Sequence, residues 1–225
     1  MLSIGQVKNI RYYTEASERQ DAPKKDENGL QYYTDSGYED ETDGVWKTAS
    51  GHPVFGIENG SYIDPKKFET LGNGYHPETE EFLLKSKTKN RKVAYDFTFS
   101  VPKAWSVLHQ MSKHTDMMIG NKTFSESMDE ERINAVHDVL DWMHRNGYIL
   151  TRTGKSGVDL KYQKAKDYVF GLYNHHTSRL GDPHDHTHCV LMNVCTREDS
   201  STGTLDNKKV MLNQKALNEL YNVFL

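Results

Sequence analysis

The chain has 225 residues, a net charge of −4, 36% hydrophobic residues and a mean hydropathy of −0.79. The length allows one large domain or two small ones. No run approaches the ~20 apolar residues of a membrane span and no signal peptide is visible, so a membrane or secreted protein is not indicated. The acidic balance argues against a simple nucleic-acid-binding protein. Cys189 and Cys195 suit a reducing compartment, and on one strand they would lie roughly 20 Å apart, too far to bond.

The N-terminal part of the chain combines a short strand pattern with a long acidic stretch. Residues 3–10 are typical of a strand, which leads into Arg11 and the tyrosine pair Tyr12 and Tyr13. Over residues 14–50, acidic residues outnumber basic ones by ten to four. We therefore expect an acidic mobile loop over residues 14–44, which contains a second tyrosine pair, Tyr32 and Tyr33.

The middle of the chain predicts two helices separated by a strand. Residues 64–71 read as a short helix, with Asp64 as the N-cap. Residues 92–99 alternate, so Val93, Tyr95, Phe97 and Phe99 share one face of a strand. Asp96 is the carboxylate on its other face. A Ser-Val-Pro sequence then opens a helix over residues 103–111.

The second half of the chain predicts two helices and three strands. The strongest helix covers residues 129–145, with a stripe formed by Ile133, Val136, Leu140 and Met143. Strands are expected over 148–153, 168–176 and 183–194, a polar hairpin over 197–207, and a helix over 213–224.

These elements predict an α+β fold in one domain, residues 1–225. Short links between strands favour a two-layer sandwich, in which a central antiparallel sheet has helices packed on one face. Because the chain ends inside a helical pattern, we expect the domain to be truncated at its C-terminal end.

Five histidines within fourteen residues are the most informative feature of the sequence. His184, His186 and His188 alternate along one strand and therefore share one face. His175 and His176 end the preceding strand, and the short turn-rich link favours an antiparallel pair. Three neutral imidazoles would make a metal site with open positions, although the spacing leaves open which three histidines bind the ion. The rival interpretation is that the histidine-rich tract binds metal ions without any function in the protein.

Tyrosine and carboxylate side chains add a second kind of chemistry. A metal ion can polarise a phosphoryl oxygen, and a tyrosine can attack phosphorus to form an ester. Asp96 could orient a histidine or accept a proton. The residues alone predict a metal-dependent phosphoryl-transfer enzyme, although tyrosine pairs and strand aspartates more often have packing or ion-pair roles.

Three sequence blocks give the chain a more specific resemblance. They are the tyrosine pairs at 12–13 and 32–33, the run Asp96-Phe97-Thr98-Phe99-Ser100-Val101-Pro102-Lys103, and the pattern from His175 through Asp182-Pro183 to His186-Thr187-His188. Together they resemble the relaxase domain of conjugative transfer proteins, the MobF class of the HUH endonucleases. The two tyrosine pairs lie further apart than in that family.

The resemblance implies a role for each matching residue. It implies His175, His186 and His188 as metal ligands, and Asp96 as the carboxylate that works with the tyrosine and a ligand histidine. Tyr12 matches the first nucleophile and Tyr32 a possible second, with Tyr13, Tyr33 and Tyr38 as further candidates. Arg11, Lys103 and Arg179 are candidate DNA contacts, although a solvated Lys103 and a structural Arg179 are the preferred interpretations.

The implied reaction is strand-specific nicking of a transfer origin by transesterification. It would give a 5′-phosphotyrosyl DNA adduct and a free 3′-hydroxyl, and strand rejoining would reverse it. The expected partners are single-stranded DNA, accessory transfer proteins and a C-terminal helicase region of the full-length protein, in the bacterial cytoplasm. Mg²⁺ or Mn²⁺ is the implied ion, while Zn²⁺ or Ni²⁺ could also occupy imidazole ligands.

Three other functions compete with this interpretation. A rolling-circle replication initiator would share the fold, but such proteins resemble the reverse motif order, with tyrosine last. A metal-dependent DNA hydrolase would leave no covalent intermediate, so a trapped adduct separates it from a relaxase. A DNA-binding or zinc-structural module without activity would show no metal-dependent nicking.

Overall fold

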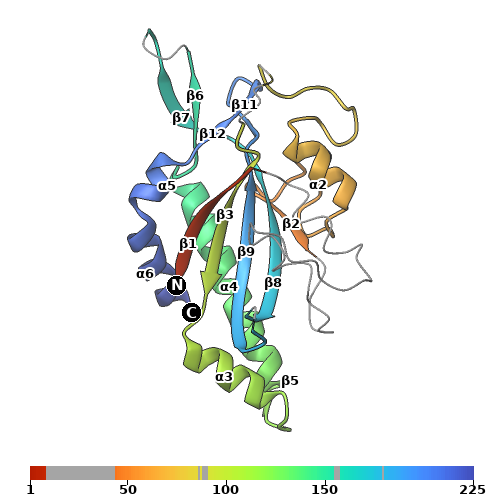
Figure 1. Cartoon of the computed structure of the whole chain (residues 1–225), viewed down its shortest axis with the longest axis vertical. Helices are drawn as coiled ribbons and strands as arrows, with labels where there is room; N and C mark the ends of the chain where they lie inside the picture. The colour runs from red at the N-terminus through yellow and green to blue at the C-terminus, as the bar shows by residue number, and fades with distance from the viewer. Residues whose placement is uncertain (9–43, 86, 88–90, 155–157, 179) are drawn as a thin grey trace.

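The computed structural model describes residues 1–8, 44–85, 87, 91–154, 158–178 and 180–225. Its centre is an antiparallel sheet with strand order β1-β3-β9-β8-β2 (Figure 1). These strands span Leu2–Val7 (β1), Val45–Thr48 (β2), Ala94–Ser100 (β3), Val169–Thr177 (β8) and Pro183–Met192 (β9). The expected α+β fold with a central antiparallel sheet is confirmed. The strand predicted over 183–194 ends at Met192, so Cys195 lies beyond it, and both cysteines are free and buried.

Three helices cover one face of the sheet, as the two-layer prediction expects. They are α3 (Lys103–Ser112), α4 (Phe124–Arg145) and α6 (Gln214–Phe224). In Figure 1, α4 runs behind the strands and α6 lies beside β1. Phe97 and Phe99 of β3 share the larger core with Val139 of α4 and Tyr221 of α6. The alternation predicted for Tyr95, Phe97 and Phe99 therefore holds in the structure, but Val93 lies before the start of β3 and packs against a second cluster on the other face.

Helix α4 differs from its prediction at its start and in its buried stripe. It begins five residues earlier than expected, because Thr123 and Glu126 form a capping box that satisfies its first backbone N–H groups. Arg132 is fully buried in the stripe, whereas the predicted Ile133 is only half-buried. The hydrophobic pattern of the helix cannot reveal that Arg132 is buried, because this residue hydrogen-bonds to Thr187 of a distant strand, β9.

The other face of the sheet has a smaller cover at one end. Helix α2 (Pro65–Gly72) begins after the N-cap Asp64, as predicted, and packs Phe68 and Leu71 against Trp46 and Val190. Figure 1 shows α2 beside β2, apart from the other helices. This second cluster adds to the predicted architecture and lies at the Val190 end of β9.

Smaller elements complete the described chain. The remaining strands are β4 (Met118–Ile119), β5 (Lys122–Thr123), β6 (Leu150–Thr153), β7 (Lys161–Lys164), β10 (Cys195–Thr196), β11 (Thr202–Gly203) and β12 (Leu205–Asp206), and the short helix is α5 (Lys208–Leu212). Strands β12, β6 and β7 form a small antiparallel sheet that projects from one end of the molecule (Figure 1). Among the described residues, no helix is long and apolar enough to cross a membrane.

Candidate metal centre and nucleic-acid interface

The β8–β9 hairpin brings histidines from two strands together, as the sequence predicts. The strands pair in antiparallel register with His175 opposite His186, so these two side chains point to the same face. His188 lies two residues further along β9 on that face. The register thereby separates two neighbours in sequence: His175 joins the three-histidine group, and His176 points to the opposite face.

The three imidazole rings are mutual neighbours. The ring centroids of His175 and His186 are 5.2 Å apart, those of His175 and His188 are 5.4 Å apart, and those of His186 and His188 are 5.1 Å apart. Imidazoles bound at about 2.1 Å to one ion with tetrahedral angles have centroids roughly 5 Å apart. The spacing of the rings therefore fits a shared divalent ion.

Hydrogen bonds select the ring tautomers that metal binding needs. The Nδ1 atom of His186 donates to the carbonyl oxygen of His184 over 2.8 Å, so Nε2 carries the lone pair of the neutral ring. Burial, together with the neighbouring imidazoles, lowers the pKa of His186 to about 3 despite this bond. A neutral imidazole is the form that binds a metal ion.

Asp96 supports His188 from the neighbouring strand β3. Its Oδ2 atom lies 2.7 Å from Nδ1 of His188, and the hydroxyl of Thr98 is 3.2 Å from the same nitrogen. A carboxylate that accepts from Nδ1 fixes the ring orientation and directs Nε2 toward a ligand. The structure thus brings Asp96 together with the histidines, in the orienting position that the sequence suggested.

Two further residues border the histidine group. The His184 ring lies 4.8 Å from the His186 ring, between centroids, so proximity alone does not remove it from the candidate ligands. Burial lowers the pKa of His184, and the nearby positive charge of Lys103 lowers this pKa further. Lys103 is exposed at the start of α3 and donates to the Pro183 carbonyl over 2.8 Å. It therefore ties α3 to β9.

The opposite face of the hairpin carries a polar group that the sequence analysis missed. Asp185 is buried, with His109 of α3 3.0 Å from Oδ2 and His176 of β8 2.7 Å from Oδ1, both through Nδ1. Burial would raise the pKa of Asp185, but the hydrogen bonds from both histidines hold it well below its ordinary value. The strand alternation was the available signal, because it places a carboxylate on the core face, where it must have partners.

The other predicted site residues lie outside the described residues. These are Arg11, Tyr12, Tyr13, Tyr32, Tyr33, Tyr38 and Arg179, and with them the acidic segment up to residue 43. Their assignments remain predictions.

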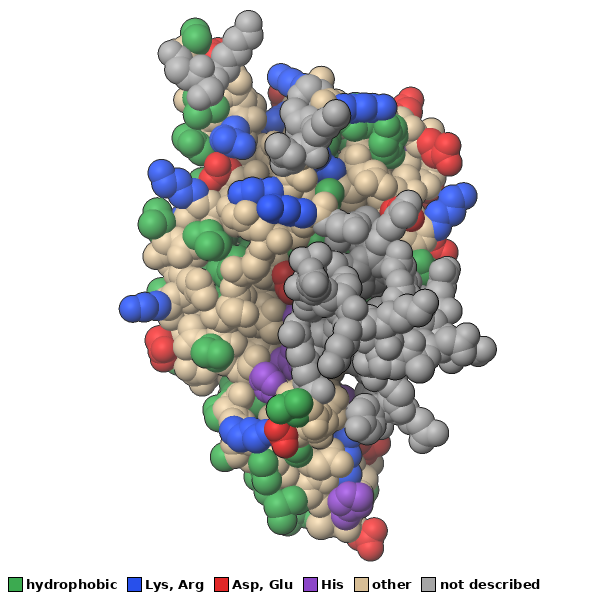
Figure 2. Space-filling view, in the orientation of Figure 1, with side chains coloured by type: hydrophobic (Ala, Val, Ile, Leu, Met, Phe, Trp, Pro, Cys, Tyr) green, Lys and Arg blue, Asp and Glu red, His purple; other side chains and the backbone are tan. Residues whose placement is uncertain are grey.

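Basic side chains gather away from the histidines. Figure 2 shows Lys and Arg side chains at the end of the molecule that carries β6 and β7. A cleft of about 520 Å³ there is lined by Lys85, Arg91, Lys92, Arg152 and Arg197, among others. Arg91 is held by the Gly72 and Asn193 carbonyls, and Arg197 by the Thr202 carbonyl. The local charge is thus positive although the whole chain is acidic, which suits a polyanion.

A central antiparallel sheet that presents three histidines and a supporting carboxylate defines a metal-binding α+β domain. The model of the TrwC relaxase family matches residues 7–225. The chain therefore belongs to the TrwC relaxase family, as the sequence motifs predicted.

Individual relatives agree with this membership. The multifunctional conjugation protein TraI of Escherichia coli (strain K12) is 30% identical over 154 residues, which cover 66% of this chain and 8% of TraI. The metal-bound structure of the conjugative relaxase TrwC in complex with oriT DNA has a TM-score of 0.72 at 22% identity, covering all of this chain and 68% of that one. TrwC bound to a 27-mer DNA with the recognition hairpin and cleavage site has a TM-score of 0.70 at the same identity, over 66% of its chain. The chain thus spans a small fraction of the curated relative.

Proposed function

We propose that this protein is a conjugative DNA relaxase that nicks one strand of a transfer origin by tyrosine transesterification. The observation that carries the proposal is the three-histidine group with Asp96, in a chain that belongs to the TrwC relaxase family. TrwC, which shares the fold, is bound to oriT DNA in solved structures, some of them metal-bound.

In the proposed reaction, the phenol of Tyr12 gives up its proton as its oxygen forms a bond to the scissile phosphorus. The bond from phosphorus to the 3′-oxygen breaks, and that oxygen takes a proton and leaves as a 3′-hydroxyl. The 5′-phosphate stays on the tyrosine as an ester, so a later 3′-hydroxyl can reverse the step. Tyr32 is the proposed second nucleophile, with Tyr13 and Tyr33 as the alternatives.

The chain's own residues position the ion and the DNA. His175, His186 and His188 are the proposed ligands of a divalent ion, Mg²⁺ or Mn²⁺ in the reaction, which supplies Lewis-acid polarisation of the phosphate. Zn²⁺ or Ni²⁺ would fit the same nitrogen ligands. Asp96 holds His188 in orientation, and the basic cleft at the β6–β7 end is the proposed contact for the DNA backbone.

The larger setting is also part of the proposal. We infer that residues 1–225 form an N-terminal relaxase domain whose full-length protein continues into a helicase region. Single-stranded DNA at the nick site and accessory transfer proteins are the proposed partners, in the bacterial cytoplasm.

A covalent-trapping experiment tests this function. Wild type, Tyr12→Phe and Tyr32→Phe are incubated with single-stranded oligonucleotides carrying candidate nick sites, with Mg²⁺ or Mn²⁺ and with chelator. We expect an adduct that survives denaturing gel electrophoresis in wild type and requires metal, and loss of this adduct in Tyr12→Phe. Cleavage without an adduct would indicate a hydrolase instead, and an undiminished adduct in Tyr12→Phe would overturn the nucleophile assignment.

A further inference from the structure

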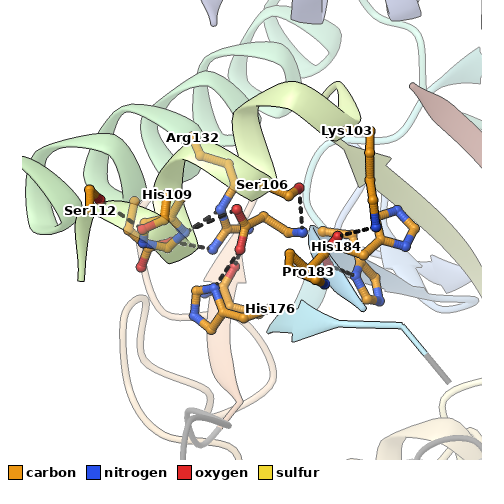
Figure 3. A network of polar contacts seen from close by, with 12 residues as sticks. Lys103, Ser106, His109, Ser112, Arg132, His176, Pro183 and His184 are labelled. Atoms are coloured by element: carbon orange, nitrogen blue, oxygen red, sulfur yellow. Dashed lines mark hydrogen bonds and ion pairs between the residues drawn. The ribbon is translucent and has the colours of Figure 1, made fainter. Parts of the chain in front are cut away.

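A second group of possible metal ligands lies on the helix-facing side of the β8–β9 hairpin. His109, His176 and Asp185 come from three elements, α3, β8 and β9, and their ligand atoms all lie within 4.8 Å of one another. Figure 3 shows His109 and His176 lying close together between α3 and the sheet. The imidazole centroids are 5.3 Å apart, and each ring contacts a different oxygen of the Asp185 carboxylate.

The group is distinct from the three-histidine group because the strands separate them. His176 follows His175 on β8, and Asp185 precedes His186 on β9, so each pair of neighbours divides between the two faces. Side chains on the two faces cannot share one ion through the backbone of the sheet.

The ligand atoms, which lie within 4.8 Å of one another, would have to move together by up to roughly 1 Å to bind one ion. Two ligands bound at about 2.1 Å to one ion lie roughly 3.0–3.4 Å apart. The observed separations from Nδ1 to the carboxylate oxygens are 3.0 Å for His109 and 2.7 Å for His176. To bind an ion between the rings and the carboxylate, each ring would carry its proton on Nε2, so that the Nδ1 lone pair points at the carboxylate.

The residues around this group hold the backbone of Asp185 in place and leave the His176 side chain partly open to solvent. The backbone N–H of Asp185 donates to Ser106 Oγ over 2.9 Å, which fixes this part of β9 against α3. The side chains of His109 and Asp185 are 3% and 2% exposed, whereas that of His176 is 10% exposed and gives a route from solvent. A buried carboxylate between two imidazoles, with an entry route and a fixed backbone, meets the requirements of a metal site.

We propose that His109, His176 and Asp185 form a second divalent-metal site, which takes Zn²⁺ or a similar ion with a preference for nitrogen and oxygen ligands. The bound ion would tie α3 to both strands of the hairpin that carries His175 and His186, with water as its remaining ligand. Two imidazoles and a carboxylate suit Zn²⁺, Co²⁺ and Ni²⁺ better than Mg²⁺. The site does not depend on the proposed nicking activity.

Metal binding without DNA tests the proposal. The full chain is stripped with a chelator and titrated with Zn²⁺, and bound ions and the melting temperature are measured. Co²⁺ is a second probe, because its absorption spectrum reports nitrogen and oxygen ligation. We expect about two ions per chain in wild type and about one in His186→Gln, with Zn²⁺ still raising the melting temperature of that variant.

Substitutions at the second site complete the experiment. Asp185→Asn and His176→Gln should each bind about one ion, and either change combined with His186→Gln should abolish Zn²⁺ binding and the rise in melting temperature. His176→Gln decides the matter if Asp185→Asn does not fold, because His176 lies at the edge of the group. His114→Gln, at an exposed histidine just after α3, is the matched control and should bind as wild type does. If His186→Gln binds no Zn²⁺ and shows no change in melting temperature, the group is a hydrogen-bonded network only and the proposal is wrong.

Discussion

The two faces of the β8–β9 hairpin use the same residue type in different ways. On one face, the His175, His186 and His188 rings contact one another, and Asp96 supports the group from its edge. On the other face, Asp185 lies at the centre and His109 and His176 donate to it. In the first group the histidine rings are central and a carboxylate lies at the edge. In the second group a carboxylate is central and two histidines surround it. The two groups therefore differ in where the carboxylate lies.

The described elements cover the two faces differently, although His186 and His188 are as buried as Asp185 and Thr187. On the three-histidine face, α2 covers only the far end of β9, near Val190 and Met192. On the other face, α3 and α4 cover the polar end, so Asp185 and Thr187 are buried and need partners.

Replacing His186 should have the largest effect. His186→Ala removes a proposed ligand, so the rate of covalent adduct formation should fall at least about 1000-fold, since metal polarisation supplies several kcal/mol. The rate is measured by gel with a single-stranded oligonucleotide. His114→Ala is the control, and a decrease of less than tenfold in His186→Ala would exclude this histidine as an essential ligand.

Replacing Arg132 tests how much its buried polar contacts beneath β9 contribute to the stability of the fold. Arg132 lies under β9, where it donates to Thr187 Oγ1 over 2.7 Å and forms an ion pair with Asp129. Arg132→Met should lower the free energy of unfolding by about 2–4 kcal/mol, because it removes the charge-assisted hydrogen bonds that the buried guanidinium makes to Thr187 and Asp129. Urea denaturation measures this loss, and Arg145→Met, at an exposed arginine of the same helix, should change it by less than about 0.5 kcal/mol. Equal effects of the two substitutions would contradict the role of Arg132.

Neutralising Asp96 should have an intermediate effect, confined to the three-histidine face. Asp96→Asn keeps the shape of the side chain but weakens its hold on His188, so metal affinity at this group should fall about 10–100-fold. Calorimetric titration of Mn²⁺ measures the change. Asp138→Asn, at an exposed aspartate of α4, is the control and should leave the Mn²⁺ affinity as in wild type; equal losses in both variants would contradict the role of Asp96.

Replacing Lys103 should have the smallest effect. Its side chain is exposed and donates to the Pro183 carbonyl, so Lys103→Ala should lower the free energy of unfolding by less than about 0.5 kcal/mol. Adduct formation should also stay close to the wild-type rate. A tenfold slower reaction would instead indicate that Lys103 contacts the DNA.

Much of the fold follows from local patterns. The alternation in β3, the capped start of α2 and the antiparallel pairing of β8 with β9 were all predictable, because each depends on neighbours in sequence. The start of α4 was missed although the Thr123 and Glu126 capping signal was present. The burial of Arg132 was missed because its contact with Thr187 crosses 55 positions in the chain.

The sequence by itself determined the family, the sheet and the presence of a histidine group, because these rest on motif order and on period-two spacing. The spacing of the histidines left open which of two adjacent residues, His175 or His176, joins that group, and the family resemblance implied His175. The tertiary structure supplied the physical reason for this choice, because the register of β8 against β9 assigns each side chain to a face. The partners of Asp185 were beyond the sequence, since α3 brings His109 to β9 from 76 residues away.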